Sequence, residues 1–363
     1  MTLASVLREK RLAVFLGPGG VGKTTVSAAC ALQAARQRRT LALTIDPAQR
    51  MADAMGIALG AKETRVAPGL DVAMLDTKQA LDELVAKYAP SPERLQDILH
   101  SSFYQTLSDA FAGSEEFASA GKLYEYLQAQ RYDLILVDTP PSKHALDFLE
   151  VPERLVRVFD SGAVQWLVKP SRVLRIAGGR FAEVLGRWTS QRHLEEMAEF
   201  FLQFDAMFLD MEQRVRAMRT ILTDPAQTGI VLLATPEPAS LRAALRFHAE
   251  LTERLRLPVD ALVVNRVLPD PPRDSGVPSR ELVALYRGAL EHVAGADPGL
   301  AEEVAAGMVE DMEHYRAAAE VQQRCLADLA KQVDCEVVQV PMLPEAVQSL
   351  EGLERIRAAI FGA

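Results

Sequence analysis

Cysteine is scarce in this sequence. The 363 residues contain only Cys30, Cys325 and Cys335, and no two of them are spaced as CxxC. Three cysteines at these spacings cannot form the disulfide framework of a small secreted domain. They also form no cysteine cluster that could bind zinc or a metalloid, so we expect no zinc or metalloid site. Scattered thiols of this kind are usually buried and reduced, which is typical of a reducing compartment.

Long apolar runs and an excess of positive charge are also missing. No uncharged apolar run reaches the ~20 residues that a membrane-spanning helix needs, and Met1–Lys10 has no apolar core of a secretion signal. Lys and Arg number 40 against 49 Asp and Glu, a formal net charge of -9 that argues against a dedicated nucleic-acid binder. We therefore expect a cytoplasmic protein without a nucleic-acid partner.

The sequence does contain short apolar runs that alternate with helical segments such as Thr24–Gln37 and Ser240–Leu255. Most of these runs are continuously apolar, which is typical of strands buried on both faces of a parallel sheet. Hydrophobic residues make up 49% of the chain, enough for a large core. We predict an α/β fold with a mostly parallel sheet flanked by helices, whose seven strands are Leu12–Leu16, Leu41–Asp46, Asp71–Leu75, Asp133–Asp138, Gly229–Ala234, Ala261–Asn265 and Glu336–Val340.

Three long stretches show helical periodicity without strands. Residues 78–131 and 142–226 interrupt the alternation, and we predict that they form an α-helical subdomain inserted into the sheet domain. Residues 279–332 form a further helical segment before the last strand. No internal repeat of the whole unit is present, so we expect residues 1–363 to form a single domain.

A glycine-rich loop connects the first predicted strand to a helix. Gly17-Pro-Gly-Gly-Val-Gly-Lys-Thr-Thr25 is the GxxxxGK[ST] pattern in the strand–loop–helix setting that it requires. Its glycines let backbone N–H groups approach phosphates, and the helix N-terminus adds a favourable dipole. Lys23 is expected to reach the β- and γ-phosphates, and Thr24 to ligate Mg²⁺ directly. The sequence thus predicts a P-loop site for ATP or ADP with Mg²⁺, formed by Gly17, Gly19, Gly20, Val21, Gly22, Lys23, Thr24 and Thr25.

Two aspartates end predicted strands near this loop. Asp138 closes a run of apolar residues, the position at which P-loop proteins place a carboxylate beside Mg²⁺, usually through water. Asp46 ends another strand before Pro47, where a carboxylate can orient the attacking water. The alternative for Asp46 is a simple strand-ending turn. With Lys23, these two carboxylates are our candidate catalytic residues, and both are expected to contact Mg²⁺ through water.

These motifs resemble the arsenical-pump and tail-anchored-protein-targeting ATPases, the ArsA/Get family of P-loop ATPases related to MinD and the nitrogenase iron protein. The resemblance extends from residue 11 to about 350 and keeps the family's order of motifs. Besides the P-loop it rests on Asp46-Pro-Ala48, Asp138-Thr-Pro-Pro-Ser-Lys-His-Ala-Leu-Asp-Phe-Leu149, Pro236-Glu-Pro-Ala-Ser-Leu241, Val263-Val-Asn265 and Pro341-Met-Leu-Pro-Glu-Ala-Val347.

The resemblance implies a dimeric ATPase in which Asp46 positions water and Asp138 lies on the Mg²⁺ side. It also implies that Asn265 contacts the adenine edge, with Pro341, Met342 and Leu343 flanking the base. An Asn amide can pair a donor and an acceptor with adenine. The alternative is a strand-terminal Asn that satisfies local backbone groups.

The sequence departs from the family at Pro18. The family's loop reads GKGGVGKT, and its first lysine reaches the partner's nucleotide; proline supplies neither the charge nor an N–H. Three alternatives follow: slow hydrolysis, substitution by another cation such as Arg50 or Lys143, or a heterodimer with a lysine-bearing paralogue. The zinc-binding CxxC of many eukaryotic targeting members is absent as well.

Two segments of the predicted helical insertion are candidate partner surfaces. Arg154–Arg192 contains eight basic and two acidic residues. Such a segment can bind an anionic membrane surface or an acidic partner, or it can be the solvated face of helices that cover the sheet. The other segment is an apolar stripe that can be either a surface for a hydrophobic client or the core seam of the subdomain. It consists of Met197, Phe201, Phe204, Phe208, Met211, Val215 and Met218, with Phe200 and Met207 beside it.

The sequence supports a leading function and an alternative. The leading hypothesis is an ATP-hydrolysing dimeric switch, a homodimer or a heterodimer with a paralogue, that couples nucleotide state to a protein client or a membrane partner. The alternative is a low-turnover regulatory subunit that pairs with a lysine-bearing paralogue. A small-molecule kinase is disfavoured because the six scattered histidines form no further acid–base constellation.

Overall fold

The computed structural model describes most of the sheet domain and parts of the intervening helical stretches. The described residues are 2–45, 50–57, 63–75, 82–83, 85–87, 89, 91–100, 115–139, 147–160, 205–269, 279–294 and 297–362. Asp46, Lys143 and most of the predicted apolar stripe and basic segment lie outside them. Within the described helices, none has the length and apolarity needed to cross a membrane.

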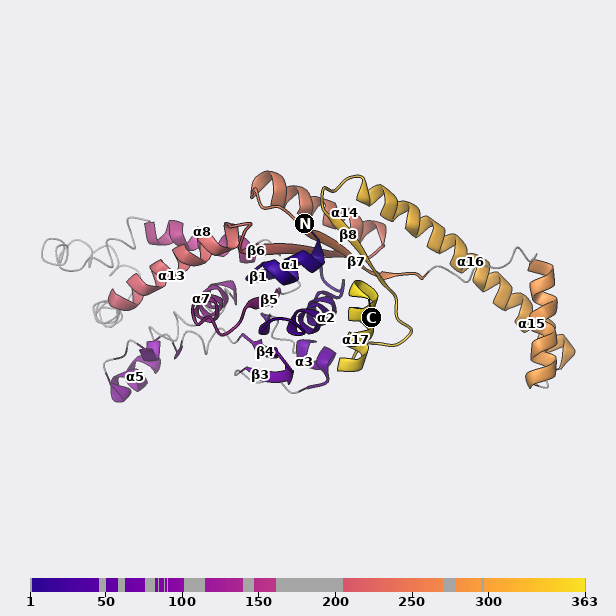
Figure 1. The fold of residues 1–363 in the computed structure, drawn as a ribbon, viewed down its shortest axis with the longest axis horizontal. Coiled ribbons are helices and arrows are strands. Elements are labelled where there is room, and N and C mark those ends of the chain that lie inside the picture. The colour runs from indigo at the N-terminus through magenta and orange to yellow at the C-terminus, as the bar shows by residue number, and fades with distance from the viewer. Residues whose placement is uncertain are drawn as a thin grey trace, which may run out of the picture.

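An eight-stranded sheet forms the centre of the molecule (Figure 1). All of its neighbouring strands are parallel except the edge pair β3–β4. The mostly parallel α/β architecture predicted from the sequence is thus confirmed. In spatial order the strands are β3 (Thr64–Ala67), β4 (Leu70–Met74), β2 (Thr40–Thr44), β5 (Leu134–Asp138), β1 (Leu12–Leu16), β6 (Thr228–Ala234), β7 (Ala261–Val267) and β8 (Glu336–Pro341).

Helices follow most of the strands along the chain. α14 ends in a single π-helical stretch, Glu250–Arg254. The described helices are α1 (Leu3–Glu9), α2 (Lys23–Ala35), α3 (Arg50–Met55), α5 (Pro92–Leu99), α7 (Glu115–Gln128), α8 (Asp147–Asp160), α13 (Asp205–Thr223), α14 (Pro238–Ala249), α15 (Ser279–Ala294), α16 (Pro298–Ala330) and α17 (Leu350–Phe361).

Two hydrophobic cores cover the two faces of the sheet, because successive side chains of a strand point to opposite faces. On β1, Leu12, Val14 and Leu16 belong to one core, which α7, α13 and α14 complete. Ala13 and Phe15 belong to the other core, which α1, α2 and α17 complete. β1, β2, β5 and β6 are therefore buried along their whole length, as their continuous apolar runs predict.

The sequence analysis missed strand β3. Its four residues are half-exposed, and it pairs only with β4, antiparallel and with a register irregularity. The turn between the two strands contains Gly69 at φ 78°, a left-handed conformation that glycine adopts without strain. A short edge strand with little apolar character gives almost no periodic signal, which is why it escaped prediction.

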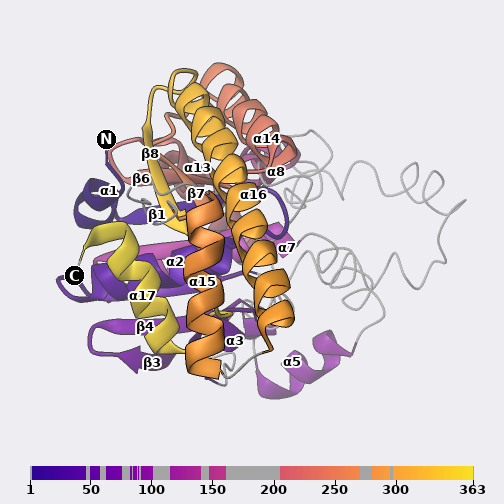
Figure 2. The ribbon, with the colours of Figure 1, turned by 90° about the vertical axis from the view of Figure 1, so that its right-hand side faces the viewer.

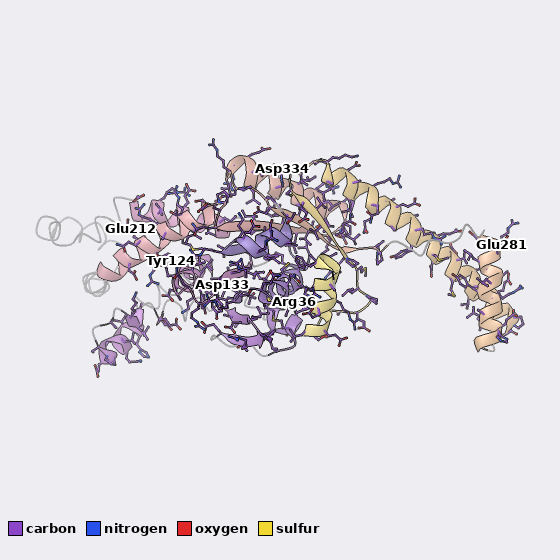
Figure 3. All side chains as sticks on the ribbon, viewed as in Figure 1. Arg36, Tyr124, Asp133, Glu212, Glu281 and Asp334 are labelled. Atoms are coloured by element: carbon purple, nitrogen blue, oxygen red, sulfur yellow. The ribbon has the colours of Figure 1, made fainter. Side chains whose placement is uncertain are left out.

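Helices α15 and α16 form an antiparallel hairpin that projects from the body (Figures 1 and 2). Glu281 of α15 lies far out on this projection, whereas Glu212 of α13 lies toward the opposite end of the molecule (Figure 3). The described parts of 78–131 and 142–226 are helical, but α7 and α13 pack directly on the sheet through residues such as Leu123 and Met218. These helices therefore continue the core of the sheet domain.

The described end of the predicted apolar stripe is buried. Val215 is 5% exposed and Met218 is fully buried against the sheet. These two side chains therefore belong to the core and are unavailable to a client in this conformation. The preceding members lie outside the described residues or have side chains that are not described.

Truncation of Met218 tests its place in the core. Met218→Ala should lower the free energy of unfolding by about 2–5 kcal/mol, because it removes packed methylenes and leaves a cavity. Met308→Ala, at a well-exposed methionine of α16, should change it by no more than about 0.5 kcal/mol in dilute protein. Denaturant unfolding measures both, and equal effects of the two substitutions would contradict a core position for Met218.

Candidate functional site

The glycine-rich loop lies between β1 and α2 at the carboxyl ends of the parallel strands. In the spatial order, β1 lies between β5 and β6, at the point where the chain's connections turn to opposite sides and ligands bind in open α/β sheets. Gly22 precedes α2 with φ 87° and ψ 30°, and a Cβ there would lie 2.2 Å from the Asn265 Nδ2 atom. A side chain at Gly22 is therefore excluded by both conformation and space.

Lys23 is buried beneath the loop that precedes it. Its Nζ donates hydrogen bonds to the backbone carbonyl oxygens of Gly17 at 2.9 Å and Pro18 at 3.1 Å, and the residue is 6% exposed. The ammonium group is thus held at the base of the loop, where phosphates bind in proteins with this motif. Pro18 takes part in this arrangement only through its carbonyl group.

A hydrogen bond joins the start of α2 to the end of β5. The Thr24 hydroxyl donates to the Asp138 Oδ2 atom at 2.7 Å, and the Thr44 hydroxyl donates to the same oxygen at 3.5 Å. Strand register brings these groups together, because Asp138 lies beside Phe15 of β1 and Thr44 of β2. Asp138 is 1% exposed. The structure thus places the two predicted Mg²⁺-side residues together.

This pair fits a magnesium ion. Mg²⁺ prefers oxygen ligands, and proteins usually hold it through one or two side chains together with water and substrate phosphates. A hydroxyl and a carboxylate are suitable ligands, and both face the loop that Lys23 supports. The described residues hold no group of three or more His, Cys, Asp or Glu that could form another metal site. Burial raises the pKa of the Cys30 thiol and raises that of Cys335 to about 11.

Asn265 links β7 to the P-loop. Its Nδ2 donates to the Val21 carbonyl oxygen at 2.9 Å, and its Oδ1 accepts a hydrogen bond from the Arg266 backbone N–H at 3.0 Å. The side chain is buried. Since an amide has two N–H groups and two lone pairs on oxygen, one donor and one acceptor position remain for an adenine. Both predicted roles of Asn265, local backbone contact and base recognition, are therefore compatible with this geometry.

Arg266 adopts an unusual backbone conformation beside this amide. It is the exposed residue of an otherwise buried β7, and its φ of 62° is left-handed, which costs a non-glycine residue about 1–2 kcal/mol. The register between β7 and β8 also shifts between Val264 and Val267. Such irregularities often redirect a side chain next to a functional site. Here the Arg266 side chain lines the pocket in front of the loop.

The segment Pro341–Leu343, which the resemblance places beside the base, lies at the end of β7. Pro341 pairs with Val267 at the end of β7, and the Met342 N–H donates to the Val267 carbonyl oxygen at 2.7 Å. Met342 is 52% exposed, whereas Leu343 packs against the core.

A pocket of about 430 Å³ opens in front of the P-loop, within the usual size range for small-molecule sites. It draws residues from the loop, α3, the ends of β5 and β7, and the segment before α17. Its lining residues are Gly19, Gly20, Gly22, Lys23, Thr24, Thr25, Arg50, Asp53, Ala54, Thr139, Arg266, Val347 and Gln348.

Thr139 belongs to the motif that follows Asp138, whereas no role was predicted for Asp53, Arg266 or Gln348. Arg266 directly follows Asn265, so its position in the sequence was a usable signal. Asp53 and Gln348 lie far apart in the chain, and no local pattern links either of them to the loop. Arg50, considered as a substitute for the missing lysine, does line the pocket. Asp46 lies outside the described residues, directly after Ile45.

The strand–loop–helix geometry and the Thr24–Asp138 pair define a P-loop nucleotide-binding protein. The family model described as "Anion-transporting ATPase" (ArsA_ATPase) matches residues 10–283. The chain belongs to this ATPase family, so the resemblance inferred from the motifs is confirmed.

Individual relatives agree with this assignment. An uncharacterised protein of Streptomyces coelicolor is 34% identical over 309 residues, which cover 82% of this chain and 75% of the relative. A protein named ATPase GET3 from Mycosarcoma maydis is 28% identical over 282 residues, covering 76% of this chain and 78% of the relative. A protein named ATPase get3 from Pyrenophora tritici-repentis is 28% identical over 281 residues, covering 74% and 77%.

Nucleotide selectivity separates the two roles of Asn265. If its amide contacts adenine as well as Val21, Asn265→Ala should weaken ATP binding by about 1–3 kcal/mol more than it weakens GTP binding. If the side chain only anchors the loop through Val21, both nucleotides should weaken equally. Calorimetric titration with ATP and GTP measures the difference. Asn265→Asp, which keeps the acceptor oxygen for the Arg266 N–H but loses the donor, is the matched control.

Proposed function

We propose that the chain binds ATP with Mg²⁺ in this pocket, hydrolyses it, and acts as a dimeric switch coupled to a protein client or membrane partner. The observation that carries the proposal is the 2.7 Å hydrogen bond between Thr24 and Asp138, directly beside the buried Lys23. It supports a metal and phosphate site that is already assembled. Membership of an ATPase family supports hydrolysis as the reaction.

Each residue then has a defined task. Lys23 turns from the loop carbonyls to the β- and γ-phosphate oxygens, and the backbone N–H groups of Gly17–Thr25 hold the phosphates. Thr24 would ligate Mg²⁺ directly, and Asp138 would hold it through water. When bound, Mg²⁺ neutralises charge on the phosphate oxygens. Asn265 and the segment Pro341–Leu343 bind the base.

Asp46 is proposed to position the attacking water. The Ile45 N–H donates to the Asp138 carbonyl oxygen at 3.1 Å, so the residue before Asp46 is fixed beside the metal-side carboxylate. Consecutive Cα atoms are only about 3.8 Å apart. Asp46 directly follows Ile45 in the sequence, which supports this assignment.

The end of β5 offers a route from nucleotide to helices. Thr139 lines the pocket and donates a hydrogen bond from its hydroxyl to the Phe15 carbonyl oxygen at 2.7 Å. Only residues 140–146 separate it from α8, which packs against α7 and α13. We propose that nucleotide state changes the position of α8 and so alters a partner surface on these helices. We propose a cytoplasmic protein, with peripheral membrane contact through Arg154–Arg192 as the alternative to a soluble client.

A second candidate function follows from Pro18. A low-turnover regulatory subunit that pairs with a lysine-bearing paralogue would bind ATP through the same pocket but need its partner for hydrolysis. Pro18 favours this alternative because the loop carries no cation at the position from which the family reaches the partner's nucleotide. Within the described chain, Arg50 lines the pocket and is our candidate to replace the missing lysine.

Asp46→Asn should separate binding from hydrolysis. An amide cannot accept hydrogen bonds from the attacking water with both of its polar atoms, as a carboxylate can. We therefore expect turnover to fall by about 100-fold or more, with ATP affinity nearly unchanged. Thr24→Val, which removes the hydroxyl at equal size, should instead abolish the tightening of ATP binding by Mg²⁺. Phosphate release and calorimetric titration measure the two effects. Unchanged turnover in Asp46→Asn would refute the catalytic assignment.

Restoring lysine at Pro18 distinguishes the two candidate functions. Trans cations contribute about 10³–10⁵-fold in other phosphoryl-transfer sites, so Pro18→Lys should raise turnover of the homodimer at least about tenfold if this charge limits the rate. Pro18→Ala, which relieves the fixed backbone without adding charge, serves as the control. Equal rates in the two variants would show that the missing cation is not limiting.

A further inference from the structure

The hairpin α15–α16 carries most of the exposed apolar side chains of the described chain. Single exposed apolar residues are common on proteins, but their concentration in one place marks an interaction surface. Among the described residues, six large hydrophobic side chains are well exposed, and only Met342 lies off the hairpin. The other five are Leu285, Leu300, Val304, Met308 and Val321.

Three of these residues form a stripe along the first half of α16. Leu300, Val304 and Met308 are four positions apart, so they share one side of the helix, and they are 41–55% exposed. The residues that follow each of them, Ala301, Ala305 and Val309, are buried. α15 lies alongside α16 (Figure 2). The helix therefore has an inner apolar stripe, which is buried, and an outer stripe, which faces solvent in the described structure.

Acidic residues lie along the same half of α16, and Glu303 and Asp311 are beside the outer stripe at helical spacing. Residues 297–315 contain no Lys or Arg but six acidic residues, Asp297, Glu302, Glu303, Glu310, Asp311 and Glu313. Glu302 accepts a hydrogen bond from Arg287 of α15 at 2.6 Å. Within the described chain, Glu303, Glu310 and Asp311 make no ion pair. Two outer stripes packed against each other would place these like charges together, which is unfavourable. The surface that covers the stripe is therefore expected to be apolar and basic.

The base of the hairpin is anchored at the rim of the nucleotide pocket. Gln322 of α16 accepts a hydrogen bond from the Leu268 N–H at 2.7 Å, and the Tyr315 hydroxyl donates to the Pro269 carbonyl oxygen at 2.7 Å. Leu268 and Pro269 directly follow β7, and Arg266 of β7 lines the pocket. From this base the hairpin extends away from the sheet (Figure 1), and the 33 residues of α16 span roughly 50 Å.

We propose that the outer stripe of α16 docks on the body of a second copy of this chain when two copies bring their pocket rims together. This inference rests on the dimeric function proposed above and names the surface that holds the partner. The rim of each copy, by which we mean Arg50, Asp53 and Arg266 of the pocket lining and the exposed Met342 directly after β8, has two cations against one acid and complements the acidic flank of the stripe. With a twofold axis between the two rims, the hairpin of each copy contacts the body of the other in the same way.

The experiment measures self-association of the full chain by sedimentation velocity, with and without Mg²⁺ and a non-hydrolysable ATP analogue. Leu300→Ser/Val304→Ser/Met308→Ser should raise the dimer dissociation constant at least about tenfold, because apolar area no longer leaves water on association. Circular dichroism and titration with the same analogue should show an unchanged fold and unchanged nucleotide binding. Ala306→Ser/Ala317→Ser, at exposed positions on the other side of α16, is the matched control and should leave association unchanged.

A charge-reversal variant distinguishes the two ways in which the hairpin could pair. Glu303→Lys/Asp311→Lys should weaken self-association if the acidic flank faces a basic rim. Stronger association in this variant would mean that hairpin meets hairpin, and would overturn the proposal.

The remaining outcomes are equally decisive. A wild-type chain that stays monomeric in all conditions, or a triple serine variant that dimerises like wild type, would overturn the hairpin proposal whether or not ATP binds. Stripe-dependent dimers of a chain that fails to bind ATP would support the hairpin proposal and refute the proposed function instead.

Discussion

The hydrogen bond from Thr24 to Asp138 depends on the parallel register of three central strands. β1 delivers the glycine-rich loop, and β5 and β2 bring a carboxylate and a second hydroxyl to the same edge of the sheet. A shift of one residue in the pairing of β1 with β5 would turn Asp138 to the other face of the sheet and break this contact. The two apolar cores that clamp the sheet therefore also fix the geometry of the candidate metal site.

The P-loop is held from the other side by Asn265. Its amide bonds to the Val21 carbonyl and leaves no room for a side chain at Gly22, so β7 and the loop are linked. The same strand then bends at Arg266, whose left-handed backbone turns its side chain into the pocket. The proposed phosphate-binding and base-binding parts of the site are thus connected through the end of β7.

The molecule places two helical regions on either side of its nucleotide site. α7 precedes β5 in the chain and α8 and α13 come after it, and all three pack on the sheet, whereas α15 and α16 come after β7 and project from the body. The first region has few described apolar side chains to offer a partner, since Val215 and Met218 are buried. The second exposes the apolar stripe of α16 on the part of the hairpin that extends away from the sheet. The apolar side of a helix is thus covered by the core in the first region and exposed in the second.

The sequence by itself determined the P-loop, seven of the eight strands and the position of Asp138 beside that loop. These features rest on local patterns: continuous apolar runs for buried strands, and a glycine spacing that only a phosphate-binding turn requires. Only the tertiary structure decided the rest. The edge strand β3 is too short and exposed to leave a pattern, and Asp53 and Gln348 meet at the pocket although nearly three hundred residues separate them. Likewise, Met218 and Met308 both follow helical apolar spacing, yet one is buried and the other exposed. Periodicity shows that a helix has an apolar side, but which neighbour covers that side is set by packing between distant segments.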